Sequence, residues 1–129
     1  MKTAAASLFL VLLSLLATQR ALLAHHGSNA YYDSSKPLTL TGTVTEFLWT
    51  NPHVQIYFDV KDEQGKVTHW SCESNSPGKL RRAGWTRTTI KPGDQITITL
   101  APARNGSQVG LAQKLVVNGK EVTNDETPY

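Results

Sequence analysis

Apolar and polar residues alternate with a period of two through most of the chain after residue 37. The alternation is clearest over residues 53–60, where it predicts a strand with one buried face made by Val54, Ile56, Phe58 and Val60. The same period predicts strands beginning at Leu38 and near Lys66, Ile96 and Val109. In the first of these, one inward face is expected to hold Leu38, Leu40, Val44 and Leu48.

One short helix is predicted between the third and fourth strands. Ser76 is placed to cap it, Pro77 suits its first position and Gly84 suits its end. Three consecutive strands, a helix and two more strands form the order of an OB-type barrel. We therefore predict an all-β domain with one short helix, folded as a small five-stranded OB-like barrel, with an open β-sandwich as the alternative. Gly42 favours the barrel because it gives the first strand a place to bend across both sheets.

The first 24 residues have the pattern of a secretory signal peptide. Lys2 precedes an apolar run from Leu8 to Ala17, and a small residue, Ala24, stands at the expected cleavage point. We expect a signal peptide at 1–24, an N-terminal arm at 25–37, the barrel at 38–122 and a tail at 123–129. The mature protein is then periplasmic, with no membrane insertion after cleavage; an uncleaved anchoring helix is the alternative.

Charge and cysteine content narrow the classes of function. Cleavage removes Lys2 and Arg20 from the 13 basic residues while all 10 acidic residues remain, so the mature chain is nearly neutral. We expect no nucleic-acid partner on that ground. Cys72 is the single cysteine, so no internal disulfide is available. His69 lies three residues before Cys72 and would project to the opposite strand face, so a buried, inert thiol is expected.

The junction Ala24-His25-His26 holds the most specific chemistry in the sequence. If an export peptidase cuts after Ala24, the α-amine and imidazole of His25 can chelate one metal ion together. A third nitrogen from His26, or from His53 if the arm folds back, would complete a site suited to copper. The alternative is that His25 and His26 are ordinary residues left behind a processing site. The candidate metal ligands are therefore His25, His26 and His53.

The corner between the first two strands is the second candidate site. Residues 49–53 read Trp-Thr-Asn-Pro-His, and the proline restricts the backbone of Asn51. In an OB-type barrel this loop borders the usual binding face. Trp49, Asn51 and Tyr57 are therefore binding candidates, and a corner that only fixes the hairpin register remains an equal alternative.

Two charged groups complete the candidates. Asp59 and Glu73 could form an acid pair across adjacent strands, or they could be ordinary solvated carboxylates. A cationic group around the helix could bind an anion or a partner, although such groups more often form a soluble face. Its members are Lys79, Arg81, Arg82, Arg87 and Lys91.

Several motifs along the mature chain carry a family resemblance. In order they are His25-His26-Gly27, Tyr32-Asp33, Leu40-Thr41-Gly42-Thr43-Val44, Trp49-Thr50-Asn51-Pro52-His53, Ser76-Pro77, Leu80, Arg82, Gly84-Trp85-Thr86-Arg87 and Lys91-Pro92-Gly93-Asp94. The chain resembles the domain of unknown function 6152 family of small exported bacterial proteins. The resemblance implies an exported OB-like β-barrel in a Gram-negative bacterium and implies no activity.

The sequence thus favours a non-enzymatic, exported periplasmic binding module that holds copper through its mature N-terminal histidine. The alternative is an envelope interaction protein that binds a peptide or glycan partner on its barrel face through Trp49, Tyr57 and the cationic helix. The partner is accordingly an unknown envelope component or a small ligand. An enzyme ranks third, because the sequence holds no serine triad, phosphate loop, cysteine-pair zinc site or nucleotide-binding fingerprint.

Overall fold

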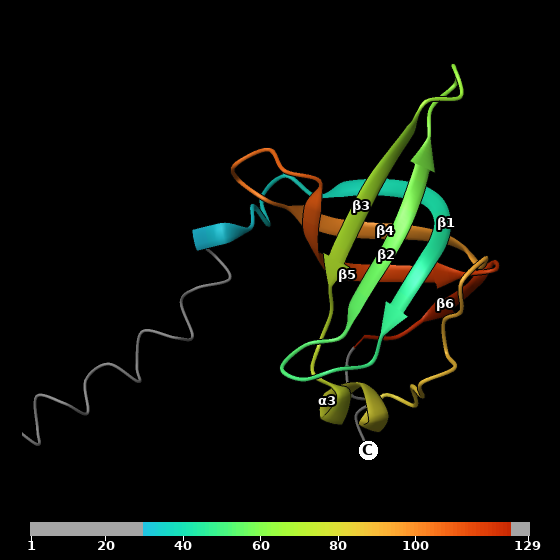
Figure 1. The fold of residues 1–129 in the computed structure, drawn as a ribbon. Helices are drawn as coiled ribbons and strands as arrows, with labels where there is room; N and C mark the ends of the chain where they lie inside the picture. Colours follow the sequence, from blue (N-terminus) through green and yellow to red (C-terminus); the bar gives the residue numbers. More distant parts are fainter. Residues whose placement is uncertain (1–29, 125–129) are drawn as a thin grey trace, which may run out of the picture. The chain divides into compact units, whose positions relative to one another are not determined.

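Six strands and one short helix form between residues 30 and 124, the part of the chain that the computed structural model describes (Figure 1). The strands are β1 (Leu38–Leu48), β2 (Gln55–Lys61), β3 (Val67–Glu73), β4 (Gln95–Pro102), β5 (Val109–Val117) and β6 (Lys120–Val122), and the helix is α3 (Pro77–Arg82). All of them belong to the unit Tyr31–Tyr129. Within the described residues, no helix is long and apolar enough to cross a membrane.

Strand pairing closes the sheet into a barrel. The antiparallel order is β3-β2-β1-β4-β5, and a parallel pairing of β3 with β5 joins the two ends through Ser71↔Val109, Cys72↔Gly110 and Glu73↔Leu111. A closed barrel of five strands with a helix between the third and fourth has the OB-like order. The predicted fold is confirmed, and the barrel is favoured over the open β-sandwich. The short strand β6 pairs with β5 in addition to the five expected strands.

Strand β1 is shared between the two sides of the barrel. Its residues Leu38–Thr43 pair with β4, and Thr43–Leu48 pair with β2. Gly42 lies at this change of partner, as predicted, and Figure 1 shows β1 curving around the barrel there. A Cβ atom at Gly42 would lie 2.4 Å from the carbonyl oxygen of Asp59, so only glycine fits without movement of the backbone.

A β-bulge in β1 overturns part of the predicted face. Val44 pairs with Phe58 and Glu46 pairs with Tyr57, so Thr45 is an extra residue without a partner on β2. The bulge reverses the inward and outward sides for the rest of the strand. Phe47 therefore packs against the core, while Leu48, predicted to point inward, is 36% exposed.

The core is built from alternate residues of the strands and from α3. On β2 and just before it, Val54, Ile56 and Phe58 are fully buried, as the alternation predicts. Each such side chain contributes about 1.5–3 kcal/mol. Cys72 is also fully buried, as expected, and burial raises the pKa of its thiol.

Helix α3 contributes Leu80 to the same core, and Trp85 follows it with 2% exposure. The helix begins where the sequence predicts, because the Ser76 hydroxyl accepts a hydrogen bond from the backbone N–H of Lys79 at 3.4 Å.

Candidate functional site

The outer face of β2 and β3 carries the polar residues of both strands. The hairpin register places Gln55 opposite Glu73, Tyr57 opposite Ser71 and Asp59 opposite His69. Because side chains alternate along a strand, these residues point away from the core that Ile56, Phe58 and Cys72 fill. The loop from Trp49 to Val54 leads into β2 at the end of this face where Gln55 lies opposite Glu73.

Glu73 forms the centre of a three-residue cluster at that end. One carboxylate oxygen, Oε1, contacts Nδ1 of His53, which comes from the β1–β2 corner. The other, Oε2, accepts a hydrogen bond from the hydroxyl of Tyr32 at 3.1 Å. Tyr32 belongs to the N-terminal arm, is 7% exposed, and is held by a bridge to Ala103 after β4. Tyr32 and His53 therefore share one carboxylate.

The electrostatics of the cluster keep its hydroxyl protonated. Burial, followed by the nearby charge and hydrogen bond of Glu73, raises the pKa of the Tyr32 hydroxyl well above its ordinary value. Tyr32 is therefore a hydrogen-bond donor at any physiological pH. The contact of Glu73 with Nδ1 leaves Nε2 of His53 as the remaining ring nitrogen, and the His53 side chain is 46% exposed.

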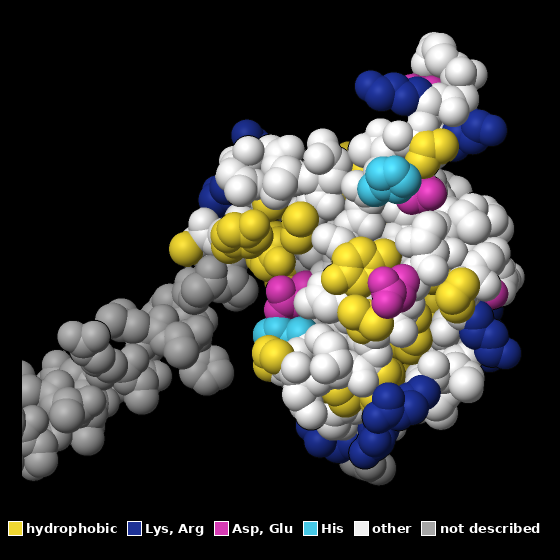
Figure 2. All heavy atoms as spheres, viewed as in Figure 1, with side chains coloured by type: hydrophobic (Ala, Val, Ile, Leu, Met, Phe, Trp, Pro, Cys, Tyr) yellow, Lys and Arg dark blue, Asp and Glu magenta, His cyan; other side chains and the backbone are white. Residues whose placement is uncertain are grey.

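Of the two alternatives left open for Asp59 and Glu73, the acid pair does not form. Asp59 pairs with His69, and Glu73 lies four positions further along β3, where it pairs with Gln55. Each carboxylate contacts a histidine instead: Asp59 Oδ1 lies 2.6 Å from Nδ1 of His69. Figure 2 shows histidine side chains beside acidic ones on this side of the molecule.

The other predicted metal ligands, His25 and His26, lie outside the described residues. Within residues 30–124, no three side chains of histidine, cysteine, aspartate or glutamate come close enough together to hold a metal ion. His53 is thus the one predicted ligand whose surroundings the described part of the chain defines.

The three binding candidates at the corner do not form one site. Trp49 packs against the core at a ring-centroid distance of 6.0 Å from Phe47, and its indole N–H is buried with no hydrogen-bond partner in the described part of the chain. Asn51 is exposed, and its carbonyl accepts a hydrogen bond from Thr50 Oγ1 at 3.4 Å. Tyr57 lies half-buried on the outer face of β2.

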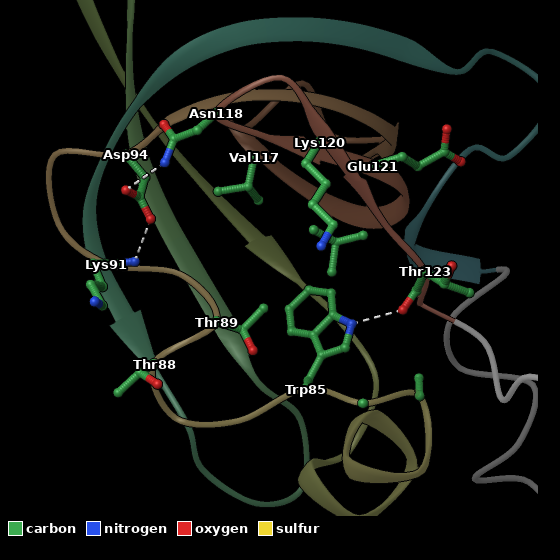
Figure 3. A pocket seen from close by; sticks show the side chains of 13 residues that line it. Trp85, Thr88, Thr89, Lys91, Asp94, Val117, Asn118, Lys120, Glu121 and Thr123 are labelled. Atoms are coloured by element: carbon green, nitrogen blue, oxygen red, sulfur yellow. Dashed lines mark hydrogen bonds between the residues drawn. The ribbon is translucent and has the colours of Figure 1, made fainter.

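Two pockets lie around Trp85, and members of the cationic group found in the sequence line both of them. The first has a volume of about 740 Å³ and lies between the segment after α3 and the β5–β6 turn (Figure 3). On its rim Asp94 accepts hydrogen bonds from the Lys91 backbone N–H at 2.8 Å and from the Asn118 side chain at 2.9 Å. The Trp85 indole N–H donates to the Thr123 carbonyl at 2.7 Å.

The second pocket, of about 420 Å³, lies between the β1–β2 corner and the segment after α3. Its lining residues are Trp49, Arg81, Trp85, Thr86, Arg87 and Thr88. The cationic group of the sequence was the available signal for this pocket, since two of its members line it. Trp49 therefore belongs with the basic residues and not with Tyr57, which lines neither of the two pockets.

The barrel places the protein in the OB-like class of β-barrels. The chain belongs to a family of unknown function, DUF6152, whose model matches residues 12–113. This confirms the family resemblance carried by the motifs. No curated protein matches the chain.

Solved structures with a similar fold include OB-like proteins of low sequence identity. The mitochondrial single-stranded DNA-binding protein Rim1 from S. cerevisiae is 9% identical with a TM-score of 0.49, covering 64% of this chain and 93% of its own. The N-terminal domain of PriB from Thermoanaerobacter tencongensis is 13% identical with a TM-score of 0.46, covering 65% of this chain and 97% of its own. At these identities and TM-scores the likeness assigns no function to this chain.

The prediction that excluded a nucleic-acid partner is corrected. One of these structural neighbours is a single-stranded DNA-binding protein, which is at odds with the exclusion. The physical error lies in the use of net charge, because a nearly neutral chain can still separate its charges locally. Residues 74–93 contain five basic residues and no acidic one. The exclusion is withdrawn, and a likeness of fold assigns no nucleic-acid ligand in its place.

Proposed function

We propose that this protein is an exported, periplasmic binding module that holds one copper(II) ion beside the β1–β2 corner. The ligands are the α-amine and imidazole of His25, exposed by cleavage after Ala24, with a further imidazole from His53 or His26. The observation that carries the proposal is the Glu73 carboxylate, which contacts both His53 and Tyr32 of the arm.

The contact with Glu73 orients the His53 ring in a way that suits metal binding. A neutral imidazole has one N–H and one lone pair, so an Nδ1–H that faces Glu73 leaves the lone pair on Nε2. Metal-binding histidines commonly donate their other ring N–H to a carboxylate, which fixes the orientation of the ring. The contact of His53 Nδ1 with Glu73 agrees with this pattern, and the His53 side chain is 46% exposed.

The position of Tyr32 supports the second half of the proposed site. Tyr32 is held beside His53, and the chain from His25 to Tyr32 can extend roughly 25 Å at about 3.5 Å per residue. This length is sufficient for the amino terminus to return to Nε2 of His53. A site of three nitrogens favours copper(II) over zinc, following the usual order of divalent affinities.

Calorimetric titration of the mature protein with copper(II) tests the proposal. One extra glycine before His25 should cost 100-fold or more in affinity, because it separates the amine from the imidazole of the chelate. His53→Ala should cost about 10-fold. His69→Ala is the matched control, because His69 also contacts a carboxylate through Nδ1 but lies on the β2–β3 hairpin away from the arm, and it should change nothing.

The outcomes separate a built site from chance chelation. Binding should weaken as the pH falls through roughly 6.5, where protons compete with metal for ordinary imidazoles. If the extra glycine leaves the affinity unchanged, the copper proposal fails. If the glycine matters but His53→Ala behaves like His69→Ala, the ion is held by the amino terminus alone, and the role given to the Glu73 cluster is wrong.

The peptide- or glycan-binding alternative is less well supported. It combined Trp49, Tyr57 and the cationic helix on one face, but Trp49 lines the pocket beside α3 and Tyr57 lies on the outer face of β2. The part of that alternative that survives is the association of Trp49 with the basic residues.

A further inference from the structure

The pocket between the β1–β2 corner and the segment after α3 has flat, apolar walls. Trp49 and Trp85 both line it, and Phe47 packs against both rings at centroid distances of 6.0 and 6.4 Å. Neither indole N–H faces the pocket space: that of Trp85 donates to the Thr123 carbonyl, and that of Trp49 is buried from solvent. Trp49, which is only partly buried, therefore offers ring carbons to a ligand, whereas Trp85, which is 2% exposed, presents only a small part of its ring.

The rim of the same pocket is positively charged. Arg81 comes from the last turn of α3, and Arg87 comes from the segment after it. A guanidinium N–H of Arg87 donates to the Trp49 carbonyl at 3.4 Å, which holds this side chain across the mouth between the two elements. Lys and Arg side chains gather at the α3 end of the molecule in Figure 2.

The segment that carries these arginines contains no acidic residue. Residues 74–93 hold five basic and no acidic residues, so the arginines face the pocket without an acidic neighbour in the sequence around them. Hydroxyl groups complete the lining, because Thr86 and Thr88 both line the pocket with their Oγ1 atoms 3.1 Å apart. Arginine forks and hydroxyls are the groups that bind carboxylate and phosphate oxygens.

We propose that this pocket binds a small organic anion with a flat apolar body. The flat body lies against the indole of Trp49, and its carboxylate or phosphate accepts hydrogen bonds from Arg81 and Arg87. A volume of about 420 Å³ suits a ligand of one or two rings and falls within the usual range for small-molecule sites. The site involves none of the proposed copper ligands, so the two proposals stand or fall separately.

Phenyl phosphate is a suitable probe, with inorganic phosphate and benzyl alcohol as its charged and apolar halves. Calorimetry with the mature protein should show one site that binds phenyl phosphate at least 10-fold more tightly than either half. Two-dimensional NMR should show the indole N–H signals of Trp49 and Trp85 shifting with the same affinity. Higher salt should weaken the binding, because the interaction is an ionic one.

Substitutions of the exposed arginines distinguish the site from general attraction. Arg87→Gln and Arg81→Gln should each reduce the affinity about 10-fold, the effect of losing one charge-assisted hydrogen bond. Lys61→Gln is the matched control, since it removes one exposed cation at the β2–β3 hairpin, and it should leave the affinity unchanged. All three positions are exposed, so the variants should unfold at the same temperature as the parent.

Three results would overturn the proposal. Equal affinity for phenyl phosphate and inorganic phosphate would mean that the indoles contribute nothing. An equal loss in Lys61→Gln would mean that the anion responds only to net charge. A single-stranded oligonucleotide that binds through the same arginines more tightly than phenyl phosphate would replace the small ligand with nucleic acid.

Discussion

Replacing Gly42 with alanine tests the close approach of β1 and β2. The new Cβ would lie 2.4 Å from the Asp59 carbonyl oxygen, 3.1 Å from the Asp59 carbonyl carbon and 3.1 Å from Cδ2 of Phe58. Two of these atoms belong to the backbone of the neighbouring strand, so a side-chain rotation cannot relieve the clash. The strands must separate instead, and the fully buried Phe58 must shift with them.

The cost follows from overpacking. Extra atoms forced into a packed region typically cost about 1–3 kcal/mol, and the backbone contact places Gly42→Ala at the upper end, about 3 kcal/mol. Alanine restricts the unfolded chain and returns only about 0.4–1 kcal/mol. In a domain of roughly 100 residues each kcal/mol changes the melting temperature by about 4–8 °C. The expected net decrease is therefore roughly 8–20 °C.

Thermal unfolding followed by circular dichroism measures this decrease. Gly78→Ala is the matched control, because Gly78 lies in α3 and a Cβ there meets nothing within 4 Å. Alanine is the better helix former, so the control should be unchanged or more stable by up to about 1 kcal/mol. A Gly42→Ala protein that melts at the same temperature as the parent would refute the close approach of the two strands.

Three further predictions concern export, the cysteine and the acid response. Amino-terminal sequencing of the exported protein should begin at His25, and Met1 retained in a membrane fraction would contradict the expected cleavage. An alkylating reagent should label Cys72 only after denaturation, because the thiol is buried with a raised pKa; rapid labelling of the native protein, seen by mass spectrometry, would contradict the inward face of β3. Hydrogen bonds from the Asn118 side chain and the Lys91 backbone lower the pKa of Asp94, so its carboxylate stabilises the fold above about pH 4, and this contribution is lost as the pH falls further. Asp94→Asn should flatten this part of the acid dependence of urea unfolding, whereas an unchanged dependence would assign it to other groups.

The sequence pattern was sufficient for β2 and for the strand order. A strict alternation with no interruption predicts one buried face, and Val54, Ile56 and Phe58 occupy it. In β1 the predicted inward face is wrong after Val44, because a β-bulge adds one residue there and no residue type in the sequence signals it. The sequence predicted a bend at Gly42. The extra residue of the bulge is instead Thr45, and threonine is a common residue in regular strands.

The candidate site was predicted only in part. His53 was identified from its type and its place at the corner, but its partner Glu73 was considered only as an acid-pair candidate with Asp59 or as a solvated carboxylate. The register of the β2–β3 hairpin was the missing signal, since the pair Lys61↔Val67 next to the turn fixes every later pair, including Gln55↔Glu73. The contact of Tyr32 with Glu73 spans 41 residues and follows from barrel closure, which a local pattern does not report.

The pairing of β3 with β5 also determines when the protein can first bury its core. The segment that closes the barrel, Val109 to Leu111, lies far along the chain from its partner strand. Until that segment has been made, the β1–β3 meander has no strand to complete it, and Ile56 and Phe58 lack the far wall that covers them. Contacts between distant parts of a chain form slowly, and an open meander exposes unpaired strand edges. A chain cut short before Val109 should therefore aggregate or be degraded, however well its first three strands are formed.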